Sequence, residues 1–364
     1  MIRLLIVDDS ALMRRLLAEL FQAEPDFEVA VARDGAEALR LLPEFRPDVV
    51  TLDVQMPGMD GLACLDRIML DRPCPVVMVS ALTQAGAEVT LAALERGAVD
   101  FVPKPGGAVS LAMEELAPQL LRKVRAAAGA RLRRSWRLAE RVRRRIRPQD
   151  APPPAPLPAP APISAPPAAA APRAAERLVL VGCSTGGPPA LDALLAPLPA
   201  DFPWPILIAQ HMPAAFTGPL AQRLDRLCAL TVSEVARPVP LQPGHAYVGR
   251  GDADLILGRQ AGGLVAMAAP ADPGHPWHPS VDRLVRSALR HRPAARLVGV
   301  MLTGMGDDGA AAMAQLQAEG GITIAEAEET AVVWGMPGRL AQLGGATVVA
   351  PLPTIADQLL RWAA

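Results

Sequence analysis

Apolar and polar positions along the first ~120 residues alternate between two patterns. Short apolar runs recur, and the stretches between them place apolar residues three or four positions apart, as in residues 11–22 and 35–42. The runs predict β-strands and the stretches between them predict amphipathic helices. The strands expected in this way are residues 3–7, 28–32, 48–52, 75–80 and 100–104. Strands that alternate with helices indicate a parallel sheet with crossover helices.

The same alternation returns from about residue 177 and continues to the end of the chain. The strands expected here are residues 178–182, 204–210, 297–302, 322–327 and 346–351. No internal repeat relates the two halves. Because 364 residues exceed what one ordinary core accommodates, we expect an α/β protein with two doubly wound parallel-sheet domains. The first would have the flavodoxin-like strand order, and the second would be Rossmann-like.

A basic stretch and a Pro/Ala tract separate these halves. Residues 121–148 place apolar side chains at near-helical spacing among many arginines, which indicates a connector helix. Weak contact of this stretch with an anionic membrane surface is the alternative. Residues 149–175 are too rich in proline and alanine to form a core and predict an extended spacer. The expected division is therefore 1–121, a linker over 122–175, and 176–364.

Composition excludes several classes of protein. The net charge of −1 favours neither nucleic acid nor membrane as a partner, and no apolar run is long enough to cross a bilayer. The first residues, "MIRLLIVDDS", reach two aspartates too soon for a signal peptide. The four cysteines lack metal-site or disulfide-framework spacing, which suits a reducing cytosol. We therefore expect a cytoplasmic protein that binds no nucleic acid.

Acidic residues follow two strands of the first half. Asp8 and Asp9 end the first expected strand, and Asp53 ends the third. In a flavodoxin-like sheet these strands are neighbours, and their carboxyl ends flank the crevice where the strand order reverses. Three converging carboxylates repel one another unless a cation lies among them, and Mg²⁺ is the hard cation that oxygen ligands suit.

A hydroxyl and an ammonium are expected at the same edge of the sheet. Ser80 ends the fourth strand and Lys104 the fifth. A metal and Lys104 would neutralise a phosphoryl group while Asp53 attacks it, so these residues suit phosphoryl transfer to a carboxylate. Unrelated surface aspartates are the alternative, but five polar groups at four strand ends favour a common site.

The motifs "LIVDDS", "VVTLDVQMPGMDGL", "MVSALT" and "DFVPKP" resemble the receiver domain of two-component response regulators. The resemblance covers the whole first half. It implies that Asp53 is the phosphoacceptor and that Asp8 and Asp9 hold Mg²⁺ with the backbone carbonyl of Gln55. It also implies that Phe101 is an aromatic switch residue, which acts together with Ser80 and Lys104.

In the second half, "GCSTG" (residues 182–186) matches the G-x-S-x-G pattern between a strand and a helix. Glycines would permit a sharp turn that exposes Ser184 as a nucleophile. Helix caps and phosphate loops are also rich in serine and glycine, so the pattern alone leaves both interpretations open.

A nucleophilic serine needs a base, and the second half contains five histidines. His211 directly follows the strand over 204–210, where side chains reach the crevice of an open α/β sheet. His291 is expected to be exposed, His275 and His278 lie in a proline-rich loop, and His245 is expected in a turn. His211 is the favoured base.

The segment "LTGMGDDG" (residues 302–309) offers an acid to orient that base. Asp307 and Asp308 follow a buried strand, and an amide such as that of Met305 could point at an oxyanion. A helix N-terminus that carries two acids is the alternative. The chain order of serine, histidine and acid differs from that of α/β-hydrolases, which disfavours that fold.

The stretches "STGGP", "AQHMP", "PSVD", "LTGMGDDG" and "WGMPG" resemble the catalytic domain of the chemotaxis protein-glutamate methylesterases. The resemblance implies a triad of Ser184, His211 and Asp308, with the backbone N–H of Met305 in the oxyanion hole and no cofactor in this domain. Cys183 stands where alanine is usual in this family. His278 stands where arginine is usual.

The two resemblances together imply a phosphorylation-activated methylesterase. Its substrates would be glutamyl methyl esters on methyl-accepting chemotaxis receptors, and receptor glutamines would be deamidated. A chemotaxis histidine kinase would be the phosphodonor, and recruitment to receptor arrays is expected. The unphosphorylated first domain is expected to cover the crevice at Ser184.

Two other functions remain open on the sequence. One is a receiver-controlled domain that binds a nucleotide or nucleic acid, with "GCSTGG" as a phosphate loop. No G-x-x-x-x-G-K-[ST] motif and no basic helix-turn-helix-like cluster supports that function. The other is an esterase or amidase that acts on small molecules.

Overall fold

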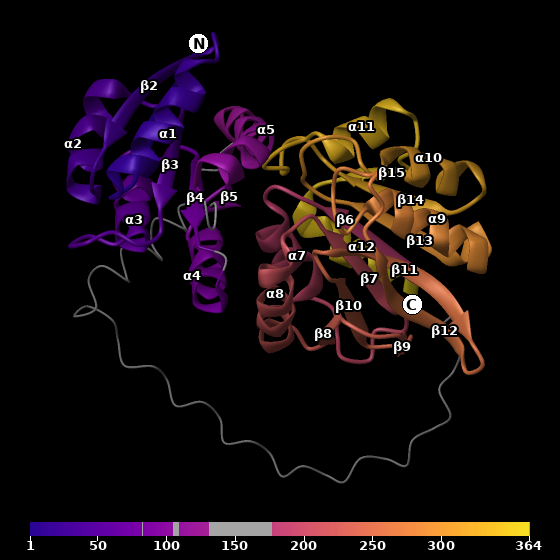
Figure 1. Cartoon of the computed structure of the whole chain (residues 1–364). Helices are drawn as coiled ribbons and strands as arrows, with labels where there is room; N and C mark the ends of the chain where they lie inside the picture. The colour runs from indigo at the N-terminus through magenta and orange to yellow at the C-terminus, as the bar shows by residue number, and fades with distance from the viewer. Residues whose placement is uncertain (82, 105–108, 131–176, 364) are drawn as a thin grey trace, which may run out of the picture.

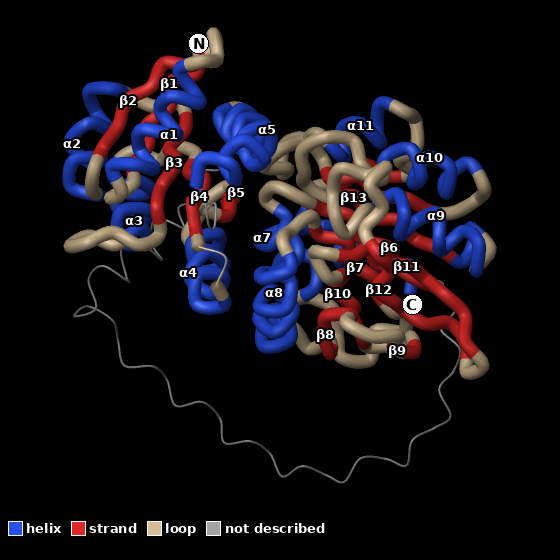
Figure 2. The backbone as a smooth tube through the Cα atoms, in the orientation of Figure 1, coloured by secondary structure: helices blue, strands red, loops and turns tan. Residues whose placement is uncertain are grey.

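The computed structural model describes residues 1–81, 83–104, 109–130 and 177–363 (Figure 1). Two parallel sheets lie in these residues, one in each half of the chain, and helices flank both (Figure 2). The α/β fold expected from the alternating pattern is therefore confirmed. Among the described residues, no helix is both long enough and apolar enough to span a bilayer.

The first sheet has five parallel strands in the order β2-β1-β3-β4-β5. This is the flavodoxin-like order, in which the chain reverses direction across the sheet between β1 and β3. Each of the five expected strands has its counterpart. The strands are β1 (Ile2–Val7), β2 (Phe27–Ala32), β3 (Val49–Asp53), β4 (Val76–Ser80) and β5 (Asp100–Pro103).

Helices cover both faces of this sheet. Buried side chains of α1 and α5 form one cluster with Leu4 and Ile6 of β1, whereas α2, α3 and α4 pack with Leu5 and Val7 on the opposite face. Alternate β1 residues thus face opposite layers, as strand geometry requires. The helices are α1 (Ala11–Gln22), α2 (Gly35–Phe45), α3 (Gly61–Asp71), α4 (Gln84–Glu95) and α5 (Val109–Ala128).

Side-chain caps determine where the first helices begin. Ser10 accepts a hydrogen bond from the backbone N–H of Met13 at the start of α1, and Asp34 and Asp60 cap α2 and α3 in the same way. Each cap satisfies a backbone donor that has no partner within its helix. The loops before these helices therefore leave the sheet in defined directions.

The second half forms a seven-stranded parallel sheet in the order β15-β14-β13-β6-β7-β10-β8. The chain enters at β6 in the middle and later returns to β13 on the other side of β6. This sheet therefore reverses between β6 and β13. Its strands are β6 (Leu178–Cys183), β7 (Ile206–Gln210), β8 (Thr231–Val235), β10 (His245–Gly249), β13 (Leu297–Met301), β14 (Ile322–Glu326) and β15 (Val348–Ala350).

Two helical layers also cover the second sheet. Buried residues of α7, α8 and α12 pack on one face, and those of α9, α10 and α11 pack on the other. A short 3-10 helix, η2 (Ala294–Arg296), precedes β13. The α-helices are α7 (Gly187–Leu195), α8 (Ala214–Leu227), α9 (Val281–His291), α10 (Ala310–Ala318), α11 (Met336–Gln342) and α12 (Leu352–Ala363).

The region between α8 and α9 contains strands that the hydrophobic pattern did not predict. Besides β8 and β10, a three-stranded antiparallel sheet has the order β11-β12-β9. It comprises β9 (Val239–Pro240), β11 (Ala253–Gln260) and β12 (Gly263–Pro270). Glycines and polar residues interrupt the apolar runs here, so their periodicity is weak, although buried Leu255 and Leu257 pack against α9.

The expected boundary at residue 121 lies within a helix. Helix α5 continues to Ala128, so residues 122–128 belong to the first domain rather than to a linker. Leu120, Val124 and Ala127 on this helix are buried against the first sheet. The rest of the basic stretch and the Pro/Ala tract lie outside the described residues.

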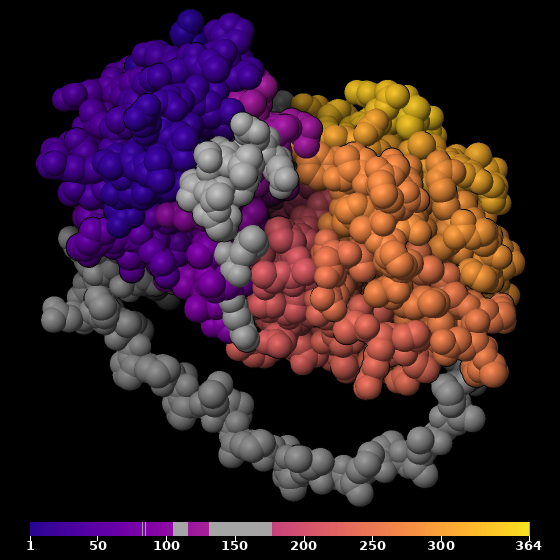
Figure 3. Space-filling model, in the orientation of Figure 1, coloured from indigo at the N-terminus to yellow at the C-terminus, as the bar shows by residue number. Residues whose placement is uncertain are grey.

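The two domains are in direct contact. Helix α4 packs against α7 and α8, and one cluster of buried apolar side chains continues from the first domain into the second. Helix α5 lies beside loops of the second domain (Figure 1), and the space-filling view shows the two bodies abutting (Figure 3). The chain thus holds its first domain against α7, α8 and the turn that follows β6.

Candidate active sites

The first candidate site lies at the carboxyl ends of β1 and β3. Single carboxylate oxygens of Asp8, Asp9 and Asp53 lie within 4.8 Å of one another. Lys104 Nζ is 2.7 Å from Asp53 Oδ2 and 3.2 Å from Asp8 Oδ2. The structure thus brings together three carboxylates and the ammonium that the sequence placed at these strand ends.

Burial and the neighbouring charges both shift the pKa values of Asp53 and Lys104. Burial holds the pKa of the Asp53 carboxyl above its ordinary value; the hydrogen bond from Lys104 opposes this, and the charge of Asp8 reinforces it. Burial alone would lower the pKa of Lys104, but Asp53 and Asp8 raise it. A divalent cation would remove the repulsion between the carboxylates, and this all-oxygen donor set fits Mg²⁺.

Of the other residues predicted for this site, Gln55 contacts Asp53, whereas Ser80 and Phe101 make contacts elsewhere. The backbone N–H of Gln55 donates to Asp53 Oδ1 at 3.1 Å, so this loop lies against the site. Ser80 is buried and donates instead to the carbonyl of Gly86 in α4. Phe101 is buried against Phe216 of the second domain, with ring centroids 4.3 Å apart.

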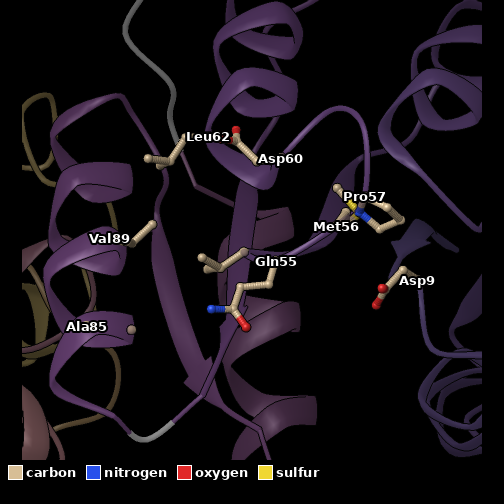
Figure 4. Close-up of a pocket in the computed structure, with 10 residues that line it drawn as sticks. Asp9, Gln55, Met56, Pro57, Asp60, Leu62, Ala85 and Val89 are labelled. Carbon is tan, nitrogen blue, oxygen red and sulfur yellow. The ribbon is translucent and has the colours of Figure 1, made fainter.

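An open pocket adjoins the first site. Figure 4 shows Asp9 and Gln55 on one side of it and Ala85 and Val89 of α4 on the other. Met56 and Pro57, in the loop after β3, line it as well. The pocket therefore opens the Asp9 side of the acidic site to solvent, between this loop and α4.

The second candidate site begins with Ser184, directly after β6. The backbone N–H of Ser184 donates to the carbonyl of Thr303, which continues the pairing of β6 with β13. Gly186 then adopts φ +78°, a conformation that favours glycine, and α7 begins at the next residue. This sharp strand-to-helix turn leaves the Ser184 side chain at the edge of the sheet.

His211 follows β7 and lies next to this turn. Its backbone N–H donates to the carbonyl of Cys183 at 3.0 Å. The side-chain amide of Gln210 donates to the carbonyls of both Ser184 and His211, at 3.0 and 3.1 Å. Gln210, which the sequence analysis did not select, thus ties the two turns together.

Asp308, and not Asp307, contacts the imidazole. Its Oδ2 is 2.8 Å from His211 Nε2, whereas Asp307 is exposed. Asp308 also accepts backbone hydrogen bonds from Val281 and Asp282, at the N-terminus of α9. Burial would raise the pKa of the Asp308 carboxyl, but the hydrogen bonds from His211 and the α9 backbone hold it below its ordinary value.

The other ring nitrogen of His211 is available as a base. Nδ1 is buried and has no hydrogen-bond partner among the described residues. An ionised Asp308 accepts the hydrogen of Nε2, which leaves the lone pair on Nδ1. The site therefore offers a hydroxyl, an imidazole and an orienting carboxylate, which is the composition of a nucleophilic triad.

The turn that contains Met305 approaches Ser184 closely. A Cβ atom placed on Gly304 would lie 2.9 Å from Ser184 Cβ, so only glycine permits this approach. The backbone N–H of Gly304 also donates to the carbonyl of Val333, and Gly304 forms an isolated β-bridge with Trp334. These contacts fix the position of the turn. Met305, the next residue, is half-buried at this edge of the site.

The other histidines lie in different environments. His245 Nδ1 contacts the carbonyl of Pro243, and His291 ends α9. His278 Nδ1 lies 2.9 Å from the buried Asp254, and His275 Nδ1 lies 3.4 Å from Ser280 Oγ. Asp254 and Ser280, which belong to the network around the triad, were not selected from the sequence.

Cys183 precedes Ser184 but has no exposed thiol. Its side chain is fully buried at the end of β6, and burial raises the pKa of the thiol. A thiol in these surroundings is a small apolar group rather than a nucleophile.

Contacts between the two domains reach the residue after Ser184. The Thr185 hydroxyl donates to Asp100 Oδ2 of β5, and Asp100 Oδ1 also accepts from Lys123 at 2.8 Å. At the other end of the interface, Arg223 of α8 donates to Glu95 of α4 at 2.5 Å. The first domain therefore touches the turn that carries the nucleophile.

Comparisons with known proteins agree with both halves of the chain. The family model described as CheB methylesterase matches residues 179–359, and the response regulator receiver domain model matches residues 4–114.

Two relatives align with the whole chain. It is 56% identical over 362 residues to protein-glutamate methylesterase/protein-glutamine glutaminase 2 of Rhodopseudomonas palustris, covering 100% of this chain and 98% of that protein. It is 51% identical over 362 residues to protein-glutamate methylesterase/protein-glutamine glutaminase 3 of Rhodospirillum rubrum, covering 100% and 96%. A crystal structure of the Thermotoga maritima CheB methylesterase catalytic domain is 37% identical, with a TM-score of 0.49, and covers 52% of this chain and 100% of that one.

Proposed function

Because this chain belongs to the CheB methylesterase family and also contains a response regulator receiver domain, we propose that Ser184, His211 and Asp308 form its triad. The chain is a phosphorylation-regulated methylesterase of chemotaxis that hydrolyses glutamyl methyl esters of receptors and deamidates glutamines. The contact of Asp308 with His211 Nε2, which leaves Nδ1 as a free acceptor, is the observation that carries the assignment.

Acylation follows from this arrangement. His211 Nδ1 takes the hydroxyl proton of Ser184 as Oγ bonds to the carbonyl carbon of the ester. The tetrahedral intermediate collapses, the carbon–methoxy bond breaks, and the imidazolium gives its proton to the departing methoxide. Asp308 stays ionised, stabilises the imidazolium and keeps the Nε2–H tautomer.

Hydrolysis of the acyl-enzyme repeats these steps with water. His211 Nδ1 takes a proton from water, which attacks the acyl carbon; the bond to Ser184 Oγ then breaks and Oγ recovers the proton. A glutamine side chain would pass through the same intermediate and release ammonia in place of methanol. The backbone N–H of Met305 is the oxyanion donor we propose, because the turn over residues 304–306 lies against Ser184.

In the first domain, we propose Asp53 as the phosphoacceptor. Asp8, Asp9 and the Gln55 carbonyl would hold Mg²⁺ together with Asp53. When bound, the metal neutralises phosphoryl oxygens and lowers the repulsion of the incoming group. Lys104, 2.7 Å from Asp53, supplies the second positive charge. The Asp53 carboxylate attacks phosphorus, and the donor's leaving group departs on the opposite side.

Phosphorylation would then relieve a contact that covers the second site. Phe101 is packed against Phe216, and Asp100 is hydrogen-bonded to Thr185 next to the nucleophile. Ser80 and Lys104 would turn toward the new phosphoryl group, and a shift of Phe101 would loosen the packing against α8. The observations that support this regulation are that Asp100 of β5 is bonded to the turn that carries Ser184 and that Arg122 of α5 lies against Trp277.

The partners and location follow from this function. The phosphodonor would be a chemotaxis histidine kinase, and the substrates would be methyl-accepting receptors. The protein would act in the cytoplasm, recruited to receptor arrays. We also propose a receiver domain that ends with α5 and a catalytic domain over residues 176–364, joined by the linker. Contact of the basic stretch with a membrane surface stays a prediction, because most of that stretch, from residue 131 onward, lies outside the described residues.

Methanol release from methylated receptor membranes tests the proposed function. Wild type should release methanol, and a phosphodonor with Mg²⁺ should increase the rate. Ser184→Ala should release none under either condition, whereas Asp53→Ala should lose only the stimulation. Methanol release by Ser184→Ala would contradict the nucleophile, and a nucleotide-binding output domain, which the relatives' names do not support, would release none even in wild type.

A further inference from the structure

The indole of Trp277 is stacked against the imidazole of His211. The two ring centroids are 5.8 Å apart and the ring planes differ by 14°, which is a stacked arrangement. The indole Nε1 lies beside the turn over residues 304–306, 3.8 Å from where a Cβ of Gly306 would be. Trp277 therefore extends from the base toward the proposed oxyanion hole.

A buried carboxylate fixes the loop that carries this tryptophan. The loop connects β12 to α9, and Asp254 of β11 accepts hydrogen bonds from it on both sides of Trp277. The donors are the backbone N–H of Asp272 at 3.2 Å, His278 Nδ1 at 2.9 Å and the backbone N–H of Ser280 at 2.6 Å. Asp254 itself is fully buried. The loop therefore has a defined position.

The same loop is bonded to both neighbours of the imidazole. The carbonyl of His278 accepts from the backbone N–H of Met212, the residue after His211, at 3.4 Å. Ser280 Oγ donates to Asp308 Oδ1 at 3.0 Å. Two residues that follow Trp277 in this loop, His278 and Ser280, thus connect to the residue after the base and to its orienting acid, so the stacked contact belongs to one hydrogen-bonded unit.

We propose that Trp277 is a positioning residue that holds the His211 imidazole in place while it transfers protons. This inference rests on the proposed function. One hydrogen bond, from Nε2 to Asp308, leaves the ring free to tilt about that contact. A stacked indole restricts the tilt, excludes water from one face, and attracts the imidazolium formed when Ser184 loses its proton.

This role has a chemical signature. Methoxide is a poor leaving group and needs the proton of the imidazolium, whereas p-nitrophenolate departs without one. Removal of the proton from Ser184 is common to both esters. Loss of Trp277 should therefore slow acylation by a methyl ester more than acylation by a p-nitrophenyl ester. A tryptophan that only supports the fold would affect both esters equally.

The first domain also touches this indole, which determines the conditions of the test. The guanidinium of Arg122, on α5, lies 5.0 Å from the centre of the Trp277 ring. Substitution of Trp277 therefore also alters the domain interface. The full chain should be assayed with Mg²⁺ and a saturating small phosphodonor, and Arg122→Ala, which removes the same contact but keeps the indole, is the matched control.

The experiment compares kcat/KM, which reports acylation, for a γ-glutamyl methyl ester peptide and for p-nitrophenyl acetate. Trp277→Leu keeps apolar bulk without a ring, and Trp277→Phe keeps a ring without the N–H. We expect Trp277→Leu to lose about 100-fold on the methyl ester and about tenfold or less on the p-nitrophenyl ester. Trp277→Phe and Arg122→Ala should each stay within about threefold of wild type on both esters.

Equal losses of Trp277→Leu on the two esters would overturn the proposal, as would a Phe variant no better than the Leu variant. A loss in Arg122→Ala as large as that in Trp277→Leu would assign the effect to the domain interface and overturn it too. Thermal unfolding checks that the variants are folded, and the Phe variant alone still tests the ring. Failure of the proposed function would look different, because wild type itself would then not hydrolyse the methyl ester.

Discussion

The two parallel sheets of this protein place polar groups at the same topological position, and the chemistry at that position differs between them. In the first sheet the chain reverses between β1 and β3, where carboxylates and one lysine gather. In the second it reverses between β6 and β13, where the Ser184 hydroxyl, the His211 imidazole and the Asp308 carboxylate gather. The topology supplies a crevice in both, and the charge of the side chains determines its use.

Asp53 and Asp308 illustrate this difference. Asp53 lies near Asp8, and its pKa is raised by burial, so its site gains from an added cation. Asp308 receives hydrogen bonds from His211 and the α9 backbone, and its pKa is lowered. The first carboxylate is therefore suited to accept a phosphoryl group with a metal, and the second is suited to remain an anion beside an imidazole.

The largest expected effect is a loss of kcat that distinguishes Asp308 from the adjacent Asp307. Asp308→Asn should reduce kcat for methyl ester hydrolysis by about 10⁴-fold, because an amide favours the tautomer whose Nδ1 carries the proton. Asp307→Asn, at the exposed adjacent position, is the matched control and should stay within about twofold. Steady-state methanol release measures both. Comparable losses in the two variants would contradict the assignment of the acid.

The next largest effect is on the stimulation by a phosphodonor, which depends on Asp53 in the first domain. Asp53→Asn should lose the stimulation by a phosphodonor, for which a coupling of about 5- to 150-fold is typical of linked sites. Chelating Mg²⁺ with EDTA should abolish the stimulation of wild type while its hydrolysis without donor continues. Methanol release with and without donor measures this. A stimulation of Asp53→Asn equal to that of wild type would refute the phosphoacceptor.

A smaller effect is expected from the ion pair between the domains. Glu95→Gln removes the partner of Arg223 across the interface. Hydrolysis by the unphosphorylated chain should rise by about two- to fivefold, because a partly exposed ion pair contributes at most about 1 kcal/mol to the closed arrangement. Glu88→Gln, at an exposed position on the same helix, should leave the rate unchanged. If both variants hydrolyse at the wild-type rate, this pair does not hold the closed arrangement.

The smallest expected effect is on thermal stability, where substitution of Asp53 and substitution of Asp308 should shift the unfolding temperature in opposite directions. Since the pKa of folded Asp53 is raised, its charge costs stability at neutral pH without Mg²⁺, and Asp53→Asn should modestly raise the unfolding temperature of the first domain. Since the pKa of folded Asp308 is lowered, it stabilises above its unfolded pKa of about 3.9 and loses this as pH falls through its folded pKa.

Asp308→Asn should accordingly lower the unfolding temperature of the second domain at pH about 6, by an amount that shrinks toward pH about 3. Thermal scans over this pH range, with hydrogen exchange to assign each transition to a domain, measure both variants. A pH-independent difference for Asp308→Asn would show that its charge contributes nothing.

Much of the fold and of both sites could be predicted from sequence. The buried strands β1, β3, β6, β7 and β13 are strongly apolar, and Asp53, His211 and Lys104 stand at or just after the ends of buried strands. Because parallel strands bring their carboxyl ends to one edge, a residue's place at a strand end predicts its place in the crevice. The choice of Asp308 over Asp307 came from the family resemblance and not from spacing.

Other features had no such signal. Strands β8–β12 alternate weakly, so the antiparallel sheet that holds Asp254 was not predicted. Asp254, Trp277 and Ser280 each contact residues that lie far away in the sequence, so no local pattern indicates their roles. The end of α5 was also missed, because a helix whose core-facing side continues past residue 121 has no local stop signal there.

The two α/β folds and the residues at the ends of their buried strands can be read from the amino-acid sequence, because hydrophobic periodicity and strand polarity are local properties of the chain. Three contacts appear only once the chain is folded: Asp308 meets Nε2 of His211 rather than Nδ1, Trp277 stacks against the imidazole, and Asp100 reaches Thr185 across the domain interface. These contacts depend on the relative positions of segments many residues apart, which packing fixes and local pattern does not.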